Sequence, residues 1–143
     1  MADSETTYLS LEEVNELLPD NLKIDTENRI ERSIYFTAEK KPLPVLNSKL
    51  YPEKYYWYSS LTKYFKEKGA EYICFVAGLY GILVIPIDVV AHYNLFSGWK
   101  GESKKGRQYH VRIKHNDNGV LTFLNFNEPK ENIELTDYFI KKS

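Results

Sequence analysis

Two adjoining apolar runs form the strongest pattern in this chain. Residues 72–77 (Tyr-Ile-Cys-Phe-Val-Ala) and residues 82–85 (Ile-Leu-Val-Ile) are almost continuously hydrophobic, and residues 78–81 (Gly-Leu-Tyr-Gly) separate them. Continuous hydrophobicity over so few residues predicts strands that are covered on both faces. The short link containing two glycines predicts that these strands form an antiparallel hairpin. Residues 87–93, directly after Pro86, predict a short helix.

Helical spacing is clearest near the N-terminus. Ser10 and Glu13 match a capping box, in which each side chain bonds the backbone N–H of the other residue. Apolar residues follow at positions 11, 14, 17 and 18, and Pro19 ends the run. This pattern predicts a short amphipathic helix with an acidic outer face. A second helix is expected between Ser60, as its cap, and Gly69, which ends it.

The remaining segments predict further strands. Residues 34–36 form one candidate, and residues 55–58 (Tyr-Tyr-Trp-Tyr) form another strand or an aromatic corner. Core and rim packing is the expected role of this aromatic group, with a pocket for a modified base as the alternative. Residues 42–52 are expected to be an extended connection. Residues 107–115 and 120–126 predict a second hairpin around the turn sequence Asn-Asp-Asn-Gly.

Strands joined mainly by hairpins, with short helices between them, predict an α+β fold. We expect a strongly bent mixed or mainly antiparallel sheet, open-barrel-like, with three or four short helices. At 143 residues the chain is expected to be a single domain. Its expected parts are an acidic N-terminal helix in residues 1–20, a sheet core in residues 33–126 and a C-terminal docking element in residues 133–141.

Composition places the chain among folded proteins and suggests a compartment. Hydrophobic residues make up 43% of the chain, which is typical of a protein with a buried core. Cys74 is the single cysteine, so an internal disulfide is excluded. The sequence lacks an apolar run of ~20 residues that would span a bilayer and lacks the features of a signal peptide. We therefore expect a cytoplasmic protein without membrane contacts.

Charge is strongly segregated, although the formal net charge is only −1. Residues 1–32 hold nine acids and three bases, whereas residues 98–115 hold six bases and one acid. Within the basic segment, polar and apolar residues alternate from position 108 to position 114. Alternation places Gln108, His110, Arg112 and Lys114 on one face of a strand, beside a loop that carries Trp99 between two glycines.

A cationic strand face beside a tryptophan loop is suited to a nucleic acid. We expect Trp99 to insert into a groove or to stack on a displaced base. The expected phosphate contacts are Lys100, Lys104, Lys105 and Lys114. The expected contacts to base edges are Arg107, Gln108, His110 and Arg112.

The order of motifs over residues 55–115 also resembles a known group of proteins. The stretch runs from Y-Y-W-Y through E-Y-I-C-F-V-A-G and G-I-L-V-I-P-I-D to Y-H-V-R-I. It resembles accessory and DNA-recognition domains of bacterial restriction endonucleases, including the N-terminal domains of McrB-like enzymes. The resemblance implies recognition of duplex DNA in a restriction or defence system. Cleavage or translocation would then come from another domain or subunit.

Two other functions remain open from the sequence. Pro19-Asp20 followed by Glu39-Lys40-Lys41 matches the PD…E-x-K pattern of Mg²⁺-dependent nucleases, with Asp20, Glu39 and Lys41 as catalytic candidates. The acidic first helix, with Glu12, Glu13 and Glu16, could instead engage a basic protein partner. The three histidines and Cys74 lack the spacing of a metal site. Outside the nuclease alternative we expect no metal and no cofactor.

Overall fold

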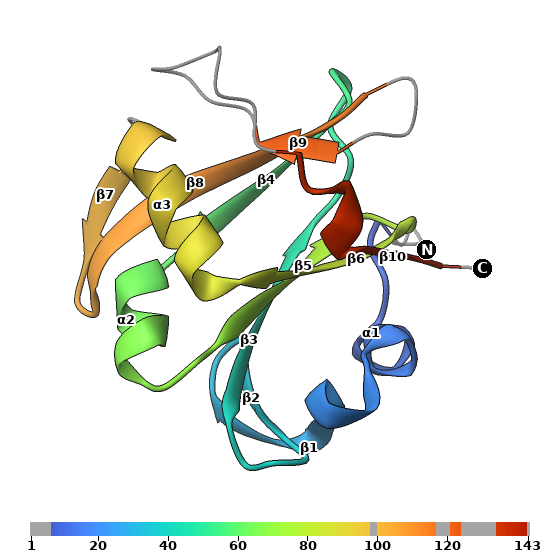
Figure 1. The fold of residues 1–143 in the computed structure, drawn as a ribbon, viewed down its shortest axis with the longest axis vertical. Helices are drawn as coiled ribbons and strands as arrows, with labels where there is room; N and C mark the ends of the chain where they lie inside the picture. Colours follow the sequence, from blue (N-terminus) through green and yellow to red (C-terminus); the bar gives the residue numbers. More distant parts are fainter. Residues whose placement is uncertain (1–6, 98–99, 117–120, 124–133, 143) are drawn as a thin grey trace, which may run out of the picture.

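A computed structural model describes residues 7–97, 100–116, 121–123 and 134–142 (Figure 1). The helical elements are α1 (Leu11–Leu17), α2 (Thr62–Glu67), α3 (Ile87–Ser97) and the 3₁₀ turns η1 (Asp20–Leu22) and η2 (Thr136–Tyr138). The strands are β1 (Ile24–Glu31), β2 (Ile34–Thr37), β3 (Pro42–Ser48), β4 (Tyr55–Ser60), β5 (Tyr72–Ala77), β6 (Gly81–Pro86), β7 (Lys100–Ser103), β8 (Gly106–His115), β9 (Leu121–Phe123) and β10 (Phe139–Lys141).

The strands of the described residues form two sheets. The first has the order β1-β2-β3-β5-β6-β10, and all its pairs are antiparallel except β3 with β5. The second has the order β4-β8-β7, and β9 also pairs with β8. Both sheets bend strongly, and α2 and α3 lie beside the second sheet (Figure 1). The predicted α+β class, with bent sheets and short helices, is confirmed.

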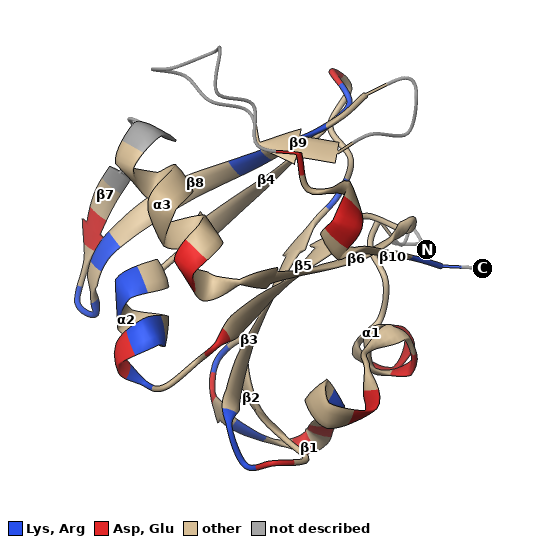
Figure 2. Cartoon of the chain, viewed as in Figure 1, with Lys and Arg blue, Asp and Glu red and all other residues tan. Residues whose placement is uncertain are grey.

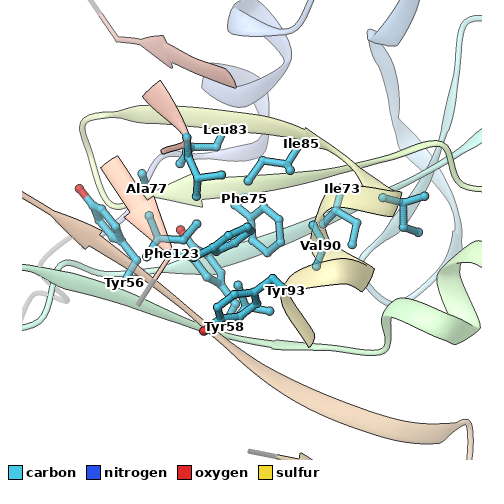
Figure 3. Close-up of a cluster of buried hydrophobic side chains, with 14 of the residues drawn as sticks. Tyr56, Tyr58, Ile73, Phe75, Ala77, Leu83, Ile85, Val90, Tyr93 and Phe123 are labelled. Atoms are coloured by element: carbon cyan, nitrogen blue, oxygen red, sulfur yellow. The ribbon is translucent and has the colours of Figure 1, made fainter. Parts of the chain in front are cut away.

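The main core lies between the two sheets. Tyr58 of β4 packs edge to face against Phe75 of β5, and Tyr93 of α3 stacks on Phe123 of β9 with ring centroids 4.1 Å apart (Figure 3). Tyr56 of β4 belongs to the same buried cluster. A second cluster fills the space between α1 and the opposite face of β5 and β6. Because both faces of this hairpin are covered, its residues are continuously hydrophobic, as predicted.

Two contacts join β4 to the first sheet. The hydroxyl of Tyr58 donates to the carbonyl oxygen of Val76 at 2.8 Å in the buried core. The backbone N–H of Trp57 donates to Oγ of Ser48, the last residue of β3, at 3.0 Å. These bonds fix the strand that carries the outward-facing aromatic residues described below.

Several local predictions hold and others are wrong. The capping box at Ser10 and the strands at residues 34–36 and 55–58 are present. The sequence predicts an extended connection over residues 42–52, and residues 42–48 of it form a strand of the first sheet. That sheet begins at Ile24, before residue 33. Helix α2 has Leu61 at its N-cap position, because Ser60 ends β4 and its hydroxyl bonds Oγ1 of Thr62. Helix α3 extends to Ser97.

Candidate nucleic-acid interface

The second sheet presents alternating buried and exposed residues, as the sequence predicts. On β8, Val111 and Ile113 are fully buried, while His110 and Arg112 between and beside them are partly exposed. Strand β4 pairs with β8 so that Trp57 lies opposite Arg112. Because partners in a sheet point to the same side, aromatic residues of β4 and cationic residues of β8 share one face. We call this surface the outer face; its residues are Lys49, Tyr51, Tyr55, Trp57, Gln108, His110, Arg112 and Lys114.

Arg112 is held by aromatic rings. Its guanidinium carbon lies 4.5 Å from the centroid of the Trp57 ring and 5.3 Å from that of Tyr55. Tyr51 stacks on Tyr55 with a centroid distance of 5.1 Å and an interplanar angle of 12°. A cation near the face of an aromatic ring is attracted to its electrons, and Trp gives the strongest attraction. The arginine side chain therefore has a restricted set of orientations on the outer face.

The ring of His110 is oriented by Trp57. Nε1 of Trp57 lies 3.1 Å from Nδ1 of His110, and the two rings meet edge to face. An indole N–H can only donate, so Nδ1 of His110 accepts the bond and carries no proton. The proton of the neutral imidazole is therefore on Nε2. His110 thus contributes a defined hydrogen-bond donor.

Lysines lie at the end of the outer face where β4 begins. The ammonium of Lys49 lies 4.9 Å from the centroid of the Tyr51 ring. Nζ of Lys114 donates to the carbonyl oxygen of Glu53 at 3.0 Å. Both contacts keep a positive charge beside the row of tyrosine and tryptophan rings.

The cations of the β7–β8 turn are arranged differently from those of the outer face. Figure 2 shows Lys and Arg at this turn, on β8 and on α2, with an acidic residue on β7. Lys104 is exposed, whereas Lys105 forms an ion pair with Glu31 of β1. Nε of Arg107 lies 3.8 Å from Oε1 of its strand partner Glu102. Two of the expected DNA contacts are thus adjacent to carboxylates.

Arg107 also lies on the side of the sheet opposite Arg112. With Lys105, Glu102 and Tyr109 it lines a hollow of 430 Å³ next to α2. The expectation that Arg107 reads base edges beside Gln108, His110 and Arg112 does not fit this arrangement, because neighbouring strand residues point to opposite faces.

Trp99, expected to contact DNA, lies outside the described residues. Lys100, the next expected contact along the chain, begins β7, where its backbone pairs with Tyr109.

The three residues expected to be catalytic if the protein were a nuclease lie in two separate segments of the chain, η1 and the β2–β3 turn. Glu39 and Lys41 line a hollow of 100 Å³ at the β2–β3 turn, together with Glu71. Nζ of Lys41 lies 2.7 Å from Oε1 of Glu71. Asp20 is exposed on η1 and, among the described residues, is not part of that lining. In the described part of the chain, no three His, Cys, Asp or Glu side chains are grouped as a metal site.

The acidic residues that could instead engage a basic protein partner lie on α1. Glu12 and Glu16 are exposed, and Oε2 of Glu13 lies 3.9 Å from Nζ of Lys142 near the C-terminus. Residues 7–97, 100–116, 121–123 and 134–142 contain no helix with the length and apolar character needed to cross a membrane.

The sequence predicts the outer face only in part. Its alternation groups Gln108, His110, Arg112 and Lys114, and the structure brings them together. Core and rim packing is the role that the sequence predicts for Tyr55 and Trp57, so their contact with Arg112 is not expected from it. Residues 55–58 are all aromatic, and only the pairing of β4 with β8 shows which of them face outward. Comparison with known proteins gives no match to this chain among family models, curated proteins or solved structures.

Proposed function

We propose that this chain is a DNA-binding module that holds duplex DNA on its outer face. The observation that carries this proposal is the guanidinium of Arg112, which lies over Trp57 and beside Tyr55 on a half-buried sheet surface. A guanidinium presents several N–H donors in one plane and matches a phosphate or the edge of guanine bidentately. Restricting its side chain before binding lowers the conformational entropy lost on binding.

The neighbours of Arg112 supply further contacts of the same kind. His110 offers the Nε2 proton to an acceptor, and Gln108 offers both a donor and an acceptor. Lys49 and Lys114 supply positive charge for phosphates at the other end of the face. The rings of Tyr55 and Trp57 are suited to stacking on a base that is kinked or displaced from the duplex.

We propose that this DNA-binding module is not itself catalytic. The resemblance of residues 55–115 to restriction-associated domains favours a role in a restriction or defence system. Another domain or subunit would then supply cleavage or translocation.

The decisive experiment compares Arg112→Gln with the matched variant Arg29→Gln. Arg29 is exposed on β1 in the first sheet, so its substitution changes the net charge equally without altering the outer face. Affinity for a fluorescent duplex is measured by anisotropy over a series of salt concentrations. We expect Arg112→Gln to weaken binding by about tenfold or more, since a bidentate arginine contact contributes ~1–3 kcal/mol.

Two further measurements sharpen the result. Arg112→Lys keeps the charge and removes the planar donors, so it should restore only part of the affinity. Parallel titrations with single-stranded DNA and with duplex RNA decide the class of nucleic acid. Equal affinity of the Arg112→Gln and Arg29→Gln variants, or tighter binding of either other nucleic acid, would contradict the proposal.

A further inference from the structure

Two hydrogen-bond donors and a second lysine, from two distant segments, meet at the carboxylate of Glu31. The ammonium of Lys105, in the β7–β8 turn, donates to Oε1. The hydroxyl of Tyr64, on α2, donates to Oε2. Nζ of Lys68, just after α2, lies 3.8 Å from Oε2. Both ammonium groups also lie 5.4 Å from the centroid of the Tyr64 ring. Together, Lys68, Lys105 and Tyr64 form a cradle for an oxyanion, which we call the lysine–tyrosine cradle.

The occupant of the cradle is charged and more enclosed than the residues that bind it. The side chain of Glu31 is 19% exposed, whereas those of Lys105 and Lys68 are 45% and 47% exposed. Hydrogen bonds from Lys105 and Tyr64 lower the pKa of Glu31, and the bond to Glu31 raises the pKa of Lys105. The carboxylate of Glu31 and the ammonium of Lys105 are therefore ionised at neutral pH.

There is space for an incoming group beside the cradle. The hollow of 430 Å³ next to α2 is lined by Tyr64 and Lys105 themselves. Lys63 and Arg107 add two cations to the same lining, against the acids Glu67 and Glu102. An anion can therefore approach Lys105 and Tyr64 from the solvent side.

We propose that the lysine–tyrosine cradle is a second phosphate-binding site for DNA and that Glu31 occupies it as an internal competitor. This inference rests on the proposed function of the outer face. A phosphate diester carries one negative charge and offers several acceptor oxygens, so it can replace a carboxylate that accepts hydrogen bonds from Lys105 and Tyr64 and lies beside Lys68. When the phosphate binds, Glu31 moves into water, and the charge inside the cradle stays the same.

The cradle lies near the β7–β8 turn, at the end of the second sheet. Five positions along β8 lead from Arg107, near the cradle, to Arg112 on the outer face, which is ~17 Å at a rise of ~3.3 Å per residue. Because Arg107 points to the side of the sheet opposite Arg112, DNA held on the outer face would reach the cradle by passing around the β7–β8 turn.

The test uses Glu31→Gln with Glu67→Gln as its matched control. Glutamine keeps the shape and an acceptor oxygen for Tyr64 but removes the charge that holds the two lysines. The control removes one negative charge from the lining of the same hollow. Binding of a fluorescent DNA duplex is measured over a series of salt concentrations.

We expect Glu31→Gln to raise the affinity by about tenfold and to steepen the slope of log K against log salt by ~0.9 for each added phosphate contact. The control should raise the affinity much less and leave the slope unchanged. An unchanged or weaker affinity of Glu31→Gln would overturn the proposal, as would an equal gain from the control.

The substitution Lys105→Gln is made both in the natural protein and in the Glu31→Gln variant. Comparing its effect on DNA affinity in the two tests whether Glu31 competes with phosphate, even if Glu31→Gln is less stable. In the natural background Lys105 is occupied by Glu31, so its loss should change the affinity little. In the Glu31→Gln background the same substitution should cost most of the gained affinity.

If Lys105→Gln weakens binding as much as Arg112→Gln in the natural background, Lys105 already binds DNA and Glu31 is no competitor. If only Arg112→Gln has an effect, the outer face stands and the second site does not; absence of all DNA binding overturns both.

Discussion

The indole of Trp57 makes two different contacts with β8. Its ring face lies under the guanidinium of Arg112, and its N–H donates to Nδ1 of His110. The first contact depends on ring area and electrons, and the second depends on one hydrogen atom. A substitution that keeps an aromatic ring but removes this hydrogen separates the two effects.

Trp57→Phe should therefore release the tautomer of His110 while leaving a ring near Arg112. Nitrogen-15 NMR of the histidine side chains reports which ring nitrogen carries the proton. We expect His110 to hold its proton on Nε2 in the natural protein and to show both tautomers in the variant, because the donor to Nδ1 is lost. His92, on α3, is the internal reference and should not change. A mixture of tautomers already present in the natural protein would contradict the assigned hydrogen bond.

At the scale of the elements, β10 is docked closely against β6. Gly81 pairs with Lys141, and a Cβ atom at Gly81 would lie 2.2 Å from the carbonyl oxygen of Ile140 and 3.0 Å from Cα of Lys141. A glycine is thus required at this position by the approach of the neighbouring backbone. At Gly101, on β7, an added Cβ would meet nothing within 4 Å.

Gly81→Ala should displace β10, whereas Gly101→Ala should be tolerated. Forcing one extra carbon into a closely packed site costs ~1–3 kcal/mol. Urea denaturation should show a loss of that size for Gly81→Ala and a change near zero for Gly101→Ala. Hydrogen exchange should also increase at the amides of residues 139–141. Equal stability of the two variants would show that the β6–β10 contact is looser than described.

The elements that sequence analysis found have strong local signals. The capping box at Ser10 and the apolar runs of β5 and β6 each follow from neighbouring residues. Strand β3 was missed because Pro42 and Pro44 indicate a break in a strand. They are tolerated because the pairing of β3 with β5 begins only at Val45, so the missing N–H groups are not needed there. Strand β1 was missed because it is a mostly exposed edge strand with few apolar residues.

The candidate site also has one part that the local sequence predicts and one part that it does not. The cationic face of β8 follows from the alternation of polar and apolar residues, which predicts that His110 and Arg112 lie on the same face. The contact of Lys105 with Glu31 joins residues 74 positions apart in the chain. No local pattern indicates that contact, so the ion pair of Lys105 cannot be predicted from the sequence.

At the scale of the whole molecule, burial affects several groups that ionise at high pH. Burial raises the pKa of Cys74 to about 12 and that of Tyr93 to about 12. It also raises the pKa of Tyr58, whose hydroxyl is bonded inside the core. In the unfolded chain these groups lose their protons near their ordinary values, 9.0 for the thiol and 10.0 for the phenols. Between those values and about 12 the folded protein therefore holds more protons than the unfolded chain.

The free energy of unfolding should consequently fall as the pH rises from 9 towards 12. Stability from these groups is fully present below pH 9 and is lost at roughly 1.4 kcal/mol per pH unit for each group that ionises only after unfolding. Denaturant midpoints at a series of pH values measure this loss. Cys74→Ala removes one of the groups and should flatten the decline that begins near pH 9. A midpoint that stays constant up to pH 11 would contradict the burial of these side chains.

The parallel pairing of β3 with β5 has a consequence for engineering the molecule. Parallel neighbours require a crossover, and here the crossover consists of β4 and α2, so the chain leaves the first sheet to begin the second and then returns. Strand β4, which carries part of the outer face, therefore lies in the sequence between two neighbouring strands of the first sheet. A shortened polypeptide beginning at β4 would lack β1, β2 and β3 of the first sheet. The outer face can therefore be transferred to another protein only as single side chains and not as one continuous segment.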